Sequence, residues 1–485
     1  MLYGKLKDHE SGQRIATSLK RLRDALHAHF HEAEIEEDDP DHADHGGLGT
    51  HDVCRMATWN LREFAPYNKF GERLDDAYYF IAEILSHFDL VALQEVRGDM
   101  GAMRKLCKLL GPTWSHIATD VTEGSPGNGE RIVFLFNRSK VWFRDIAGEL
   151  TLPSGKKIQD PFGLRIQSED RLTLQYVDPV DLLIPDNAGL KTKGGDQVLK
   201  SRTRIRLPKG GVLDLPDETD LVVPSGTKVE VLADGRRRIG RDRIFTVDGR
   251  EALEFPTSVT GEGLLQFART PYLASFQCGW LKMMLCSVHI YYGDEAEQSE
   301  GMERRTEEIR KLTESIAARA KKENDSDVDN FFFVLGDFNI VGKNHATMDA
   351  LLSNDFVIPE GIQTIPAGTN VKRDRYYDQI AYWNGTSFRN RPGNVTSVEV
   401  RRAGIFDFFK HVYRMDDDDP GGADEAAYTP LMNAKLQEAR DAGRSSAGSW
   451  RYSDWRTYQM SDHLPMWVEL KVDYTDEFLD ELTGE

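Results

Sequence analysis

The chain has 485 residues, of which 40% are hydrophobic and 29% are charged. This composition is typical of a globular protein and excludes a wholly disordered chain, and the length allows one large domain with insertions or two or three smaller ones. No run approaches the roughly 18 apolar residues of a membrane span, so we expect none. The net charge of −19 disfavours a uniformly polyanion-binding surface, because affinity for nucleic acid comes largely from Lys and Arg.

Four cysteines, Cys54, Cys107, Cys278 and Cys286, are scattered in or beside apolar runs, and none forms a CxxC pair. Such spacing is typical of reduced core residues and differs from a disulfide framework or a zinc site. No apolar run of the kind found in a secretory signal follows the first residues. The sequence therefore predicts a cytoplasmic location.

Residues 10–36 are predicted to be helical, because apolar side chains recur every three or four residues at Ile15, Leu19, Leu22, Leu26 and Phe30. The acidic stretch that follows favours a solvated linker. The alternative is a metal site formed by His42, His45 and His51. We assign residues 1–50 to an N-terminal helix and linker, which either docks on the core or recruits a partner.

From Cys54 onward, short apolar runs bounded by turns predict β-strands. These strands are expected at residues 55–60, 90–95, 132–136, 273–277, 283–289, 331–335, 379–383 and 465–470. Helices are predicted at 77–87 and 299–322. Because strands and helices mix without strict βαβ alternation, the pattern favours a sandwich of sheets covered by helices.

Two stretches interrupt this pattern. Residues 151–262 are rich in Gly, Pro and short alternating runs, which predicts a β-rich insertion dividing a catalytic domain into 51–150 and 263–475. Residues 415–450 begin with an acidic run and end in Gly and Ser. We expect that stretch to be a long surface loop with one short helical run.

Basic clusters stand out in the predicted insertion. They include two groups of arginines, Arg202, Arg204 and Arg206 in the first and Arg236, Arg237 and Arg238 in the second. Alternating arginines on a strand project from one face and are suited to tracking phosphates. The alternative is a pair of solvated β-edges that charge protects from aggregation.

Polar residues stand at the carboxyl ends of four apolar runs, namely Asn60, Glu95, Asp337 with Asn339, and Asp462 with His463. Strand ends and their loops are where rigid scaffolds present catalytic groups. Each fragment alone is also compatible with a capped turn or a surface acid. Taken together, the four fragments suit phosphodiester hydrolysis.

A hard divalent cation, Mg²⁺ or Mn²⁺, binds carboxylate oxygens and keeps several waters. We predict that Glu95 and Asp462 hold it; Ca²⁺ is a further candidate, and the sequence is compatible with one ion or two. The metal stabilises charge on phosphoryl oxygens and lowers the pKa of a bound water. A neutral amide such as Asn60 holds a phosphate oxygen without adding repulsion, and His289 or His463 can move a proton near neutral pH.

The fragments and their order resemble the endonuclease/exonuclease/phosphatase superfamily from about residue 54 to 472, and within it the deoxyribonuclease I branch. The likeness is carried by residues 60–64, 94–97, 130–136, 287–289, 336–339, 377–380, 406–408 and 461–465. The last of these, Ser-Asp-His-Leu-Pro, matches the terminal motif of the branch almost residue for residue. The resemblance implies an α/β fold of the α+β type, a four-layered sandwich of two packed, mostly antiparallel β-sheets flanked by helices.

The resemblance also implies an acid–base pair of histidines. His289, held by Glu130, and His463, held by Asp378, would each have a carboxylate that sets the tautomer and stabilises the imidazolium. A water molecule would attack phosphorus in line, and the 3′ oxygen would leave.

The same resemblance implies how the substrate is bound. The groups that would bind the scissile phosphate and the metal are Asp337, Asn339 and Asn60, and those that would contact DNA are Arg62 and Arg97. We therefore expect nucleic acid, DNA before RNA, as the partner of this site.

Three features depart from the branch. Asn128 stands where an aromatic residue precedes the orienting glutamate, Gln379 replaces an arginine, and the disulfides of secreted members are absent. We expect a divalent-metal-dependent phosphodiesterase that acts as an endonuclease and cuts one strand of duplex DNA. The alternatives are a phosphatase or phospholipase-like member that acts on a small phosphorylated or lipid head group, and a nuclease-like binding protein without catalysis.

Overall fold

A computed structural model describes residues 3–31, 52–68, 70–122, 129–152, 267–293, 300–324, 330–385, 397–415, 423–443 and 451–483, and the backbone of strands between 158 and 265. The chain forms two compact units. The sandwich unit comprises Met1–Thr151, Phe267–Tyr292 and Glu308–Glu485, and the insertion unit comprises Leu152–Gln266 and Gly293–Glu307. Every residue predicted for the catalytic site belongs to the sandwich unit.

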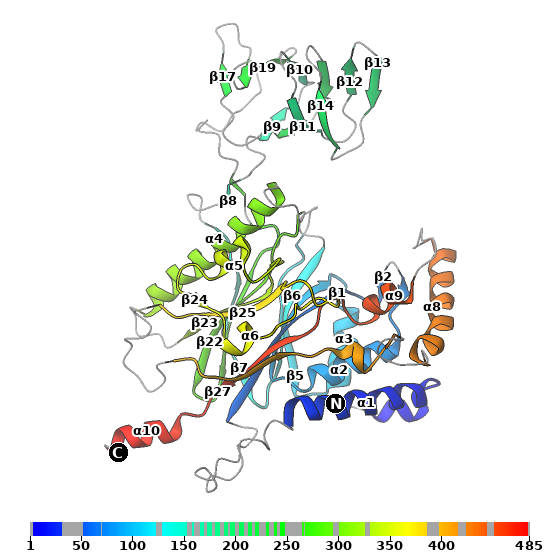
Figure 1. The fold of residues 1–485 in the computed structure, drawn as a ribbon, viewed down its shortest axis with the longest axis vertical. Coiled ribbons are helices and arrows are strands. Elements are labelled where there is room, and N and C mark those ends of the chain that lie inside the picture. The colour runs from blue at the N-terminus through cyan, green and yellow to red at the C-terminus, as the bar shows by residue number, and fades with distance from the viewer. Residues whose placement is uncertain are drawn as a thin grey trace. The chain divides into compact units, whose positions relative to one another are not determined.

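Two six-stranded sheets form the centre of the sandwich unit (Figure 1). Sheet I has the order β26 (Val400–Ile405), β27 (Met466–Lys471), β1 (Val53–Phe64), β4 (Leu90–Arg97), β6 (Glu130–Asn137) and β5 (Trp114–Ala118). Sheet II has the order β24 (Phe356–Val357), β25 (Asp378–Trp383), β23 (Phe331–Asp337), β22 (Leu281–His289), β21 (Tyr272–Cys278) and β7 (Val141–Glu149).

Each sheet has one parallel pair at its centre. In sheet I, β1 and β4 run parallel and the other neighbours antiparallel. In sheet II, β22 and β23 run parallel and the other neighbours antiparallel. The predicted sandwich of two mostly antiparallel sheets is confirmed.

Helices cover the outer faces of both sheets, which makes four layers (Figure 1). Those beside sheet I are α1 (Gly12–His31), α2 (Asp75–Leu85), α3 (Gly101–Leu110), α8 (Ala423–Asp441) and α9 (Tyr452–Gln459). Those beside sheet II are α4 (Glu300–Asn324) and α5 (Ala346–Leu351). Shorter elements are η1 (Gly4–Asp8), β2 (Tyr67–Asn68), β3 (Gly71–Glu72), α6 (Glu360–Gln363), η5 (Phe408–Lys410) and α10 (Thr475–Thr483).

The inner faces of the two sheets pack through aromatic rings. Phe276 on β21 contacts Phe134 and Phe136 on β6, with ring centroids 5.4 and 5.3 Å apart. Because helices cover the other faces, central strands are buried on both sides and consist of nearly continuous apolar runs. Strand β23, for example, is buried along all 7 residues. Truncating Phe276 to Ala would cost about 3–5 kcal/mol.

Helix α1 docks on the sandwich unit. The predicted stripe is buried, from Ile15 to Phe30, and packs in the same core as sheet I. Ion pairs flank the stripe, with Arg14 on Asp76 at 2.9 Å and Arg21 on Asp424 at 3.0 Å. The helix ends at His31, and residues 32–51, which include the predicted linker with His42, His45 and His51, lie outside the described residues.

The surface loop predicted for residues 415–450 is wrong in its central part. Residues 423–441 form helix α8, which has 19 residues and contains Pro430. Tyr428, Met432 and Leu436 are buried in the core of sheet I and its helices. Their spacing of four residues places them on one helical face, and this burial outweighs the helix-breaking tendency of the proline.

The insertion unit contains two larger sheets and one two-stranded sheet among its described strands. A seven-stranded sheet has the order β13 (Gly195–Val198), β12 (Gly189–Thr192), β15 (Val212–Leu215), β10 (Leu172–Tyr176), β19 (Arg243–Val247), β18 (Arg237–Ile239) and β17 (Val229–Val231). A four-stranded sheet has the order β14 (Thr203–Leu207), β11 (Val180–Ile184), β16 (Thr219–Val222) and β9 (Arg165–Ser168). Strands β8 (Ile158–Gln159) and β20 (Leu264–Leu265) pair with each other.

The predicted basic clusters fall partly on these strands. Arg204 and Arg206 lie on β14, and Arg237 and Arg238 lie on β18. Their side chains, and the whole of Arg202 and Arg236, lie outside the described residues.

Two further sequence predictions concern the cysteines and the absence of a membrane span. All four cysteines are free thiols, and three of them are buried. Among the described helices, none is both long and apolar enough to cross a membrane.

Candidate active site

Strand direction gathers the polar residues at one edge of the sandwich. Asn60 and Glu95 lie near the carboxyl ends of the parallel strands β1 and β4, and His289 and Asp337 end the parallel strands β22 and β23. Within sheet II, His289 and Asp337 are direct register partners. Parallel neighbours present their carboxyl ends at the same edge of a sheet, so each sheet contributes two of these residues.

The antiparallel neighbours begin at that same edge. Glu130 opens β6 and Asp378 opens β25, and His463 lies three residues before β27. An antiparallel strand starts where its neighbour ends, so these residues join the cluster although the chain separates them widely. Topology alone therefore explains why the predicted residues meet.

The backbone of β1 and β4 is irregular at the site. The pairing register shifts between Asn60 and Phe64 and again at Leu93–Val96. Arg62 has φ 39° and Glu95 has φ 59°, both in the left-handed region. Bulges re-aim side chains, and such backbone conformations cost about 1–3 kcal/mol each. The bulges turn Glu95 and the residues after Asn60 toward the site.

Gly336 permits the close approach of β22 and β23. It has φ 137°, and a Cβ atom placed there would lie 2.1 Å from the carbonyl oxygen of Val288. Only glycine fits such a position without displacing the neighbouring strand. The glycine of the Gly-Asp-Phe-Asn segment therefore sets Asp337 opposite His289.

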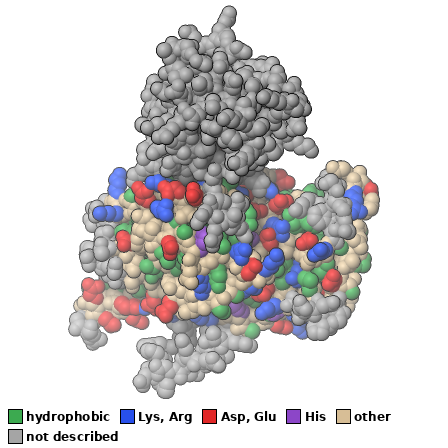
Figure 2. Space-filling model, turned by 45° about the horizontal axis from the view of Figure 1, so that its top comes forward, with side chains coloured by type: hydrophobic (Ala, Val, Ile, Leu, Met, Phe, Trp, Pro, Cys, Tyr) green, Lys and Arg blue, Asp and Glu red, His purple; other side chains and the backbone are tan. Residues whose placement is uncertain are grey.

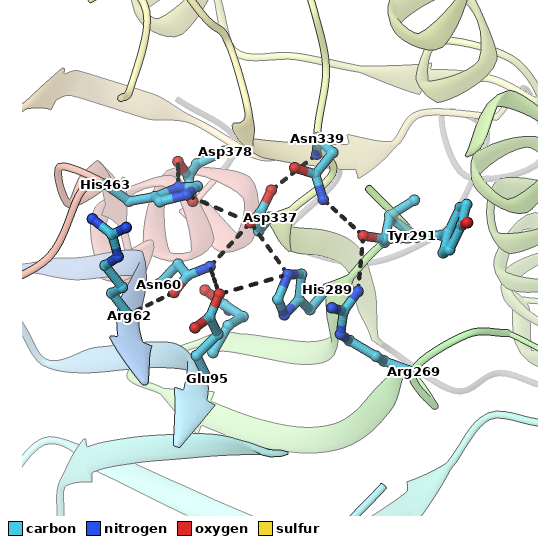
Figure 3. Close-up of polar contacts among 12 residues, drawn as sticks. Asn60, Arg62, Glu95, Arg269, His289, Tyr291, Asp337, Asn339, Asp378 and His463 are labelled. Atoms are coloured by element: carbon cyan, nitrogen blue, oxygen red, sulfur yellow. Dashed lines mark hydrogen bonds and ion pairs between the residues drawn. The ribbon is translucent and has the colours of Figure 1, made fainter. Parts of the chain in front are cut away.

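Asn60 joins acids from the two sheets (Figure 3). Its Nδ2 donates to Glu95 Oε1 at 3.1 Å and to Asp337 Oδ2 at 3.0 Å. Its Oδ1 accepts from the backbone N–H of Arg62 at 2.9 Å. A neutral amide thus holds two carboxylates close together without adding charge, as its residue type suggests.

The two histidines form the predicted couples with carboxylates. His289 Nδ1 lies 2.5 Å from Glu130 Oε1, and His463 Nδ1 lies 2.8 Å from Asp378 Oδ2. The Nε2 atoms lie 3.5 Å and 3.7 Å from the same atom, Asp337 Oδ2. With each Nδ1 engaged by its own carboxylate, both Nε2 atoms face one small region (Figure 3).

These neighbours shift the proton affinities. Burial alone would lower the pKa of His463, but the charges of Asp378 and Asp337 outweigh it and raise the pKa well above its usual value. Burial and Arg269 oppose the same effect at His289, whose pKa is nevertheless raised by Glu130. Acids at both positions therefore favour the imidazolium form.

The pKa of Glu95 is shifted in the opposite direction from that of Asp378. Burial alone would raise the pKa of Glu95, but His289, the N–H of Glu63 and the amide of Asn60 bring it below the usual value. The pKa of Asp378, in contrast, is raised by burial. Glu95 therefore stays an oxygen donor suited to a cation over a wide pH range.

Arg269 belongs to the site, and sequence reasoning missed it. Its Nε lies 2.8 Å from Glu130 Oε1, and its side chain is 12% exposed. It also donates to the carbonyl oxygen of Ile290 at 3.4 Å. The available signal was a lone arginine just before the apolar run of β21, a position from which a buried acid can be neutralised.

The roles of two hydroxyl groups in the site were also missed, although Ser461 is part of the terminal motif. Ser461 Oγ donates to the carbonyl of Asn60 at 2.5 Å and accepts from the N–H of His463 at 2.9 Å. Thr369 Oγ1 accepts from the N–H of Asp378 at 3.0 Å. Both fix the backbone of a His–carboxylate couple, which only the folded chain reveals.

Arg62, Asp462 and Arg97 lie at the rim. The Arg62 guanidinium stacks over the ring of Tyr458, with its Cζ atom 3.9 Å from the ring centroid. It also forms an ion pair with Asp462, with Nη1 3.1 Å from Oδ2. Arg97 lies 3.5 Å from Glu63 Oε1. The Asp462 side chain is 39% exposed, so it borders the cluster whose buried members are Glu130, His289, Asp337, Asp378 and His463.

The donor set fits a hard divalent cation. Ligand atoms of Glu95, Glu130 and His289 lie within 4.8 Å of one another, as do those of Asp337, Asp378 and His463. Glu95 Oε1 and Asp337 Oδ2 share the Nδ2 donor of Asn60, and oxygen donors are those that Mg²⁺ and Mn²⁺ prefer. Acids outnumber arginines in this cluster, so a cation would relieve repulsion among them.

Comparison with known proteins gives similarities in structure and none in sequence. No family model and no curated protein matches the chain. An endonuclease/exonuclease/phosphatase family protein from Bacteroides thetaiotaomicron is 15% identical, with TM-score 0.38, and the match covers 87% of this chain and 98% of that one.

Two further solved structures are similar to the same extent. Mannosyl-6-phosphatase from Bacteroides thetaiotaomicron is 14% identical, with TM-score 0.37, over 86% of this chain and 99% of that one. D. rerio TDP2, solved with a single strand DNA product, is 10% identical, with TM-score 0.38, over 86% of this chain and 99% of that one. At these identities and TM-scores, the substrates of those proteins are no evidence for the substrate of this chain.

Proposed function

We propose that the chain is a divalent-metal-dependent phosphodiesterase of the endonuclease/exonuclease/phosphatase superfamily, and an endonuclease on DNA. The observation that carries the proposal is the pair of histidines whose Nε2 atoms both lie within 3.7 Å of Asp337 Oδ2 while a carboxylate engages each Nδ1. Hydrolysis of a phosphodiester needs one group to take a proton from water and another to give a proton to the leaving oxygen. Two oriented imidazoles facing one region meet that need.

The carboxylates give the histidines their roles. Glu130 and Asp378 accept from the Nδ1–H groups of His289 and His463, which leaves each Nε2 to exchange a proton with water or with the 3′ oxygen. Asn60 donates its neutral side-chain amide to Asp337 Oδ2 at 3.0 Å. Asn339 donates its backbone N–H to Asp337 Oδ1 at 2.9 Å, and its side-chain Nδ2 donates to the carbonyl oxygen of Ile290 at 2.7 Å. Water then attacks phosphorus in line, between groups that are already in place.

The cation would be held by Glu95 and Asp462, with Asp337 close by, and Mg²⁺ or Mn²⁺ suits these oxygen donors. When bound, the ion stabilises charge on the phosphoryl oxygens and makes a bound water more acidic. The chain itself keeps Glu95 ionised and orients it through Asn60 and the N–H of Glu63, at 2.8 Å from Glu95 Oε2.

Nucleic acid is the proposed partner because of the arginines at the rim. Arg62, near the carboxyl end of β1, pairs with Asp462, and Arg97, the last residue of β4, lies beside Glu63. Guanidinium groups bind phosphate oxygens in two-pronged contacts. Positive and negative side chains are interspersed on the face shown in Figure 2, so this face is not uniformly acidic although the chain has a net charge of −19. The free cysteines agree with the cytoplasmic location we propose.

Plasmid cleavage tests the proposal. Purified protein is expected to nick supercoiled plasmid with Mg²⁺ or Mn²⁺, and a chelator should abolish nicking. His463→Ala should reduce the rate by roughly 10²–10⁴, the usual contribution of general acid–base groups. Linear duplex, single strands and RNA in the same panel identify the preferred nucleic acid.

The alternative has its own readout. If plasmid, duplex, single strands and RNA all stay uncut while a phosphoinositide or a sugar phosphate is dephosphorylated, the nuclease assignment is wrong. The chain is then a phosphatase or a phospholipase-like enzyme. If no phosphoester is hydrolysed with either metal, the enzyme assignment itself is wrong.

A further inference from the structure

A compact loop, residues 368–375, is tied directly to the catalytic histidine. The backbones of Asn370 and His463 form an isolated antiparallel β-bridge. On either side of it, the N–H of Val371 donates to the carbonyl oxygen of Asp462 at 2.9 Å, and the N–H of Leu464 donates to the carbonyl oxygen of Thr369 at 2.8 Å. The segment that bears Asp462 and His463 is therefore paired with this loop, so anything bound to the loop lies next to the proposed reaction.

Asn370 also holds the loop in one shape. Its Oδ1 accepts from the N–H groups of Asp374 and Arg375, both at 3.0 Å, and its Nδ2 donates to Asp374 Oδ1 at 2.6 Å. The N–H of Gly368 closes the loop on the carbonyl of Arg373 at 2.9 Å. Side-chain to backbone bonds of this kind preorganise a turn, which lowers the cost of ordering it when a ligand binds.

The loop is basic in an acidic chain. Lys372, Arg373 and Arg375 face one acid, Asp374, which pairs with Arg375 at 3.8 Å. Lys372 is exposed and Arg373 is partly exposed. The loop therefore offers positive side chains to the phosphates of a polyanion bound beside the site.

Aromatic rings continue from the loop to the site. The ring of Tyr377 lies 5.6 Å from that of His463, centroid to centroid. The ring of Tyr292 lies 6.3 Å from Tyr377 at 80°, and Tyr292 is 43% exposed. Two nearly perpendicular rings form a corner in which a flat ligand can stack on one ring and meet the edge of the other.

We propose that this loop, with Tyr377 and Tyr292, is a strand-binding subsite that takes an unpaired nucleotide next to the scissile phosphate. The base stacks in the Tyr292–Tyr377 corner, and the flanking phosphate contacts Lys372 and Arg373. The proposal rests on the phosphodiesterase function and adds the substrate class, a single-stranded or locally opened nucleic acid. A paired base keeps its faces inside the duplex, whereas an unpaired base offers them to aromatic side chains.

Binding without metal tests the subsite independently of catalysis. Fluorescence anisotropy would compare a labelled thymidine strand with an all-abasic strand of equal length, which keeps the phosphates and lacks the bases. The wild type should bind the thymidine strand more tightly. Tyr292→Ala should weaken that binding by roughly 5- to 150-fold, the range for stacking one base, and leave binding of the abasic strand unaffected.

A matched aromatic control is Trp142→Ala. Trp142 is 55% exposed and pairs with Gln277 near the end of β21 that is farther from the site. Trp142→Ala should leave the affinities for the thymidine strand and the abasic strand unchanged. Tyr292→Phe, which keeps the ring, should bind both strands as the wild type does. The proposed stacking of a base between Tyr292 and Tyr377 would be wrong if the wild type bound both strands with equal affinity. It would also be wrong if Tyr292→Ala weakened the binding of both strands equally.

The basic loop is tested by salt dependence. Lys372→Gln with Arg373→Gln should weaken both strands and reduce the slope of log affinity against log salt by about 1.4, since each phosphate contact on a single strand contributes about 0.7. Lys108→Gln with Lys282→Gln, on α3 and at the start of β22, is the charge control and should leave the slope alone. An unchanged slope in the loop variant would remove the phosphate contact from the proposal.

Hydrolysis separates this inference from the proposed function. If the wild type shows the base-dependent binding but cleaves neither strand with Mg²⁺ or Mn²⁺, the phosphodiesterase function fails and the subsite fails with it as a catalytic one. If it cleaves both strands with the same KM, and Tyr292→Ala changes neither KM, the enzyme stands and the subsite is wrong.

Discussion

The two ends of strand β1 use charged residues in opposite ways. At the amino end, pairing with β27 is regular, and Glu469 accepts from Arg55 Nε at 2.7 Å and from Arg402 at 2.9 and 3.0 Å. Both arginines also donate to the carbonyl oxygen of Phe30 at the end of α1. Here two cations surround one buried acid and join three strands and a helix.

At the carboxyl end the pairing breaks, and acids outnumber fixed cations. Asn60 stands between Glu95 and Asp337, and Arg62 and Glu63, which come shortly after it, have positive φ. A neutralised acid stabilises a fold, whereas an end with excess acids and a strained backbone costs stability and is kept ready for a cation and a phosphate. The contrast teaches that stability and activity should respond to different residues of one strand.

The largest effect expected is on catalysis. His289→Asn and His463→Asn keep a donor for Glu130 and Asp378 but lack Nε2, so each should lower kcat by roughly 10²–10⁴. The free energy of unfolding, from urea denaturation, should stay within about 1 kcal/mol of the wild type, because the bond to the carboxylate is retained. Near-normal kcat in either variant would contradict a shared role of the two couples.

The second effect concerns Arg269. Glu130→Gln should lower the free energy of unfolding by about 3 kcal/mol, because it leaves a nearly buried guanidinium without its acid. Adding Arg269→Met should restore much of that loss, since removing both members of a buried pair is often neutral. Urea denaturation at pH 7 measures both. Equal stability of the two variants would show that Arg269 is not neutralised by Glu130.

The third effect sharpens the contrast at the amino end. Arg402 and Arg55 outweigh the effect of burial and lower the pKa of Glu469, so its stabilisation is present above the unfolded value of about 4.3 and is lost as pH falls through the lower folded value. Glu469→Gln should cost roughly 2–3 kcal/mol at pH 7 and leave kcat unchanged. The difference between wild type and variant should shrink below about pH 4. A constant difference down to pH 3 would argue against the shift.

The smallest effect lies at the docked helix. Burial, with the nearby Arg402 and His411, lowers the pKa of His29 to about 4. The unfolded chain binds a proton on this residue below about pH 6.5, so stability should fall as pH drops from about 6.5 to 4. His29→Gln, which keeps an acceptor for Trp467 Nε1, should flatten this part of the profile by on the order of 1 kcal/mol, because solvent screens a half-buried group. Equal slopes for the two proteins in a urea series would contradict it.

The sequence indicated the central strands and the polar residues at their ends. The apolar runs around Val91, Leu285 and Phe333 are local signals, because strands covered on both faces contain few polar residues. Asn60, Glu95, Asp337 and His463 could be named as candidate site residues because they interrupt or follow such runs and match a family order. Edge strands β5, β7 and β26 were missed, since their mixed, partly exposed residues lack that signal.

The tertiary structure decided everything that depends on contact between distant segments. Helix α8 is helical because Tyr428, Met432 and Leu436 bury one face against the core, an outcome hidden by Pro430 and the acidic flank. The pairing of Arg269 with Glu130 joins residues 139 positions apart. Local sequence sets which strands form and which side chains end them, whereas the direction of each strand and the packing of two sheets set which of those side chains meet.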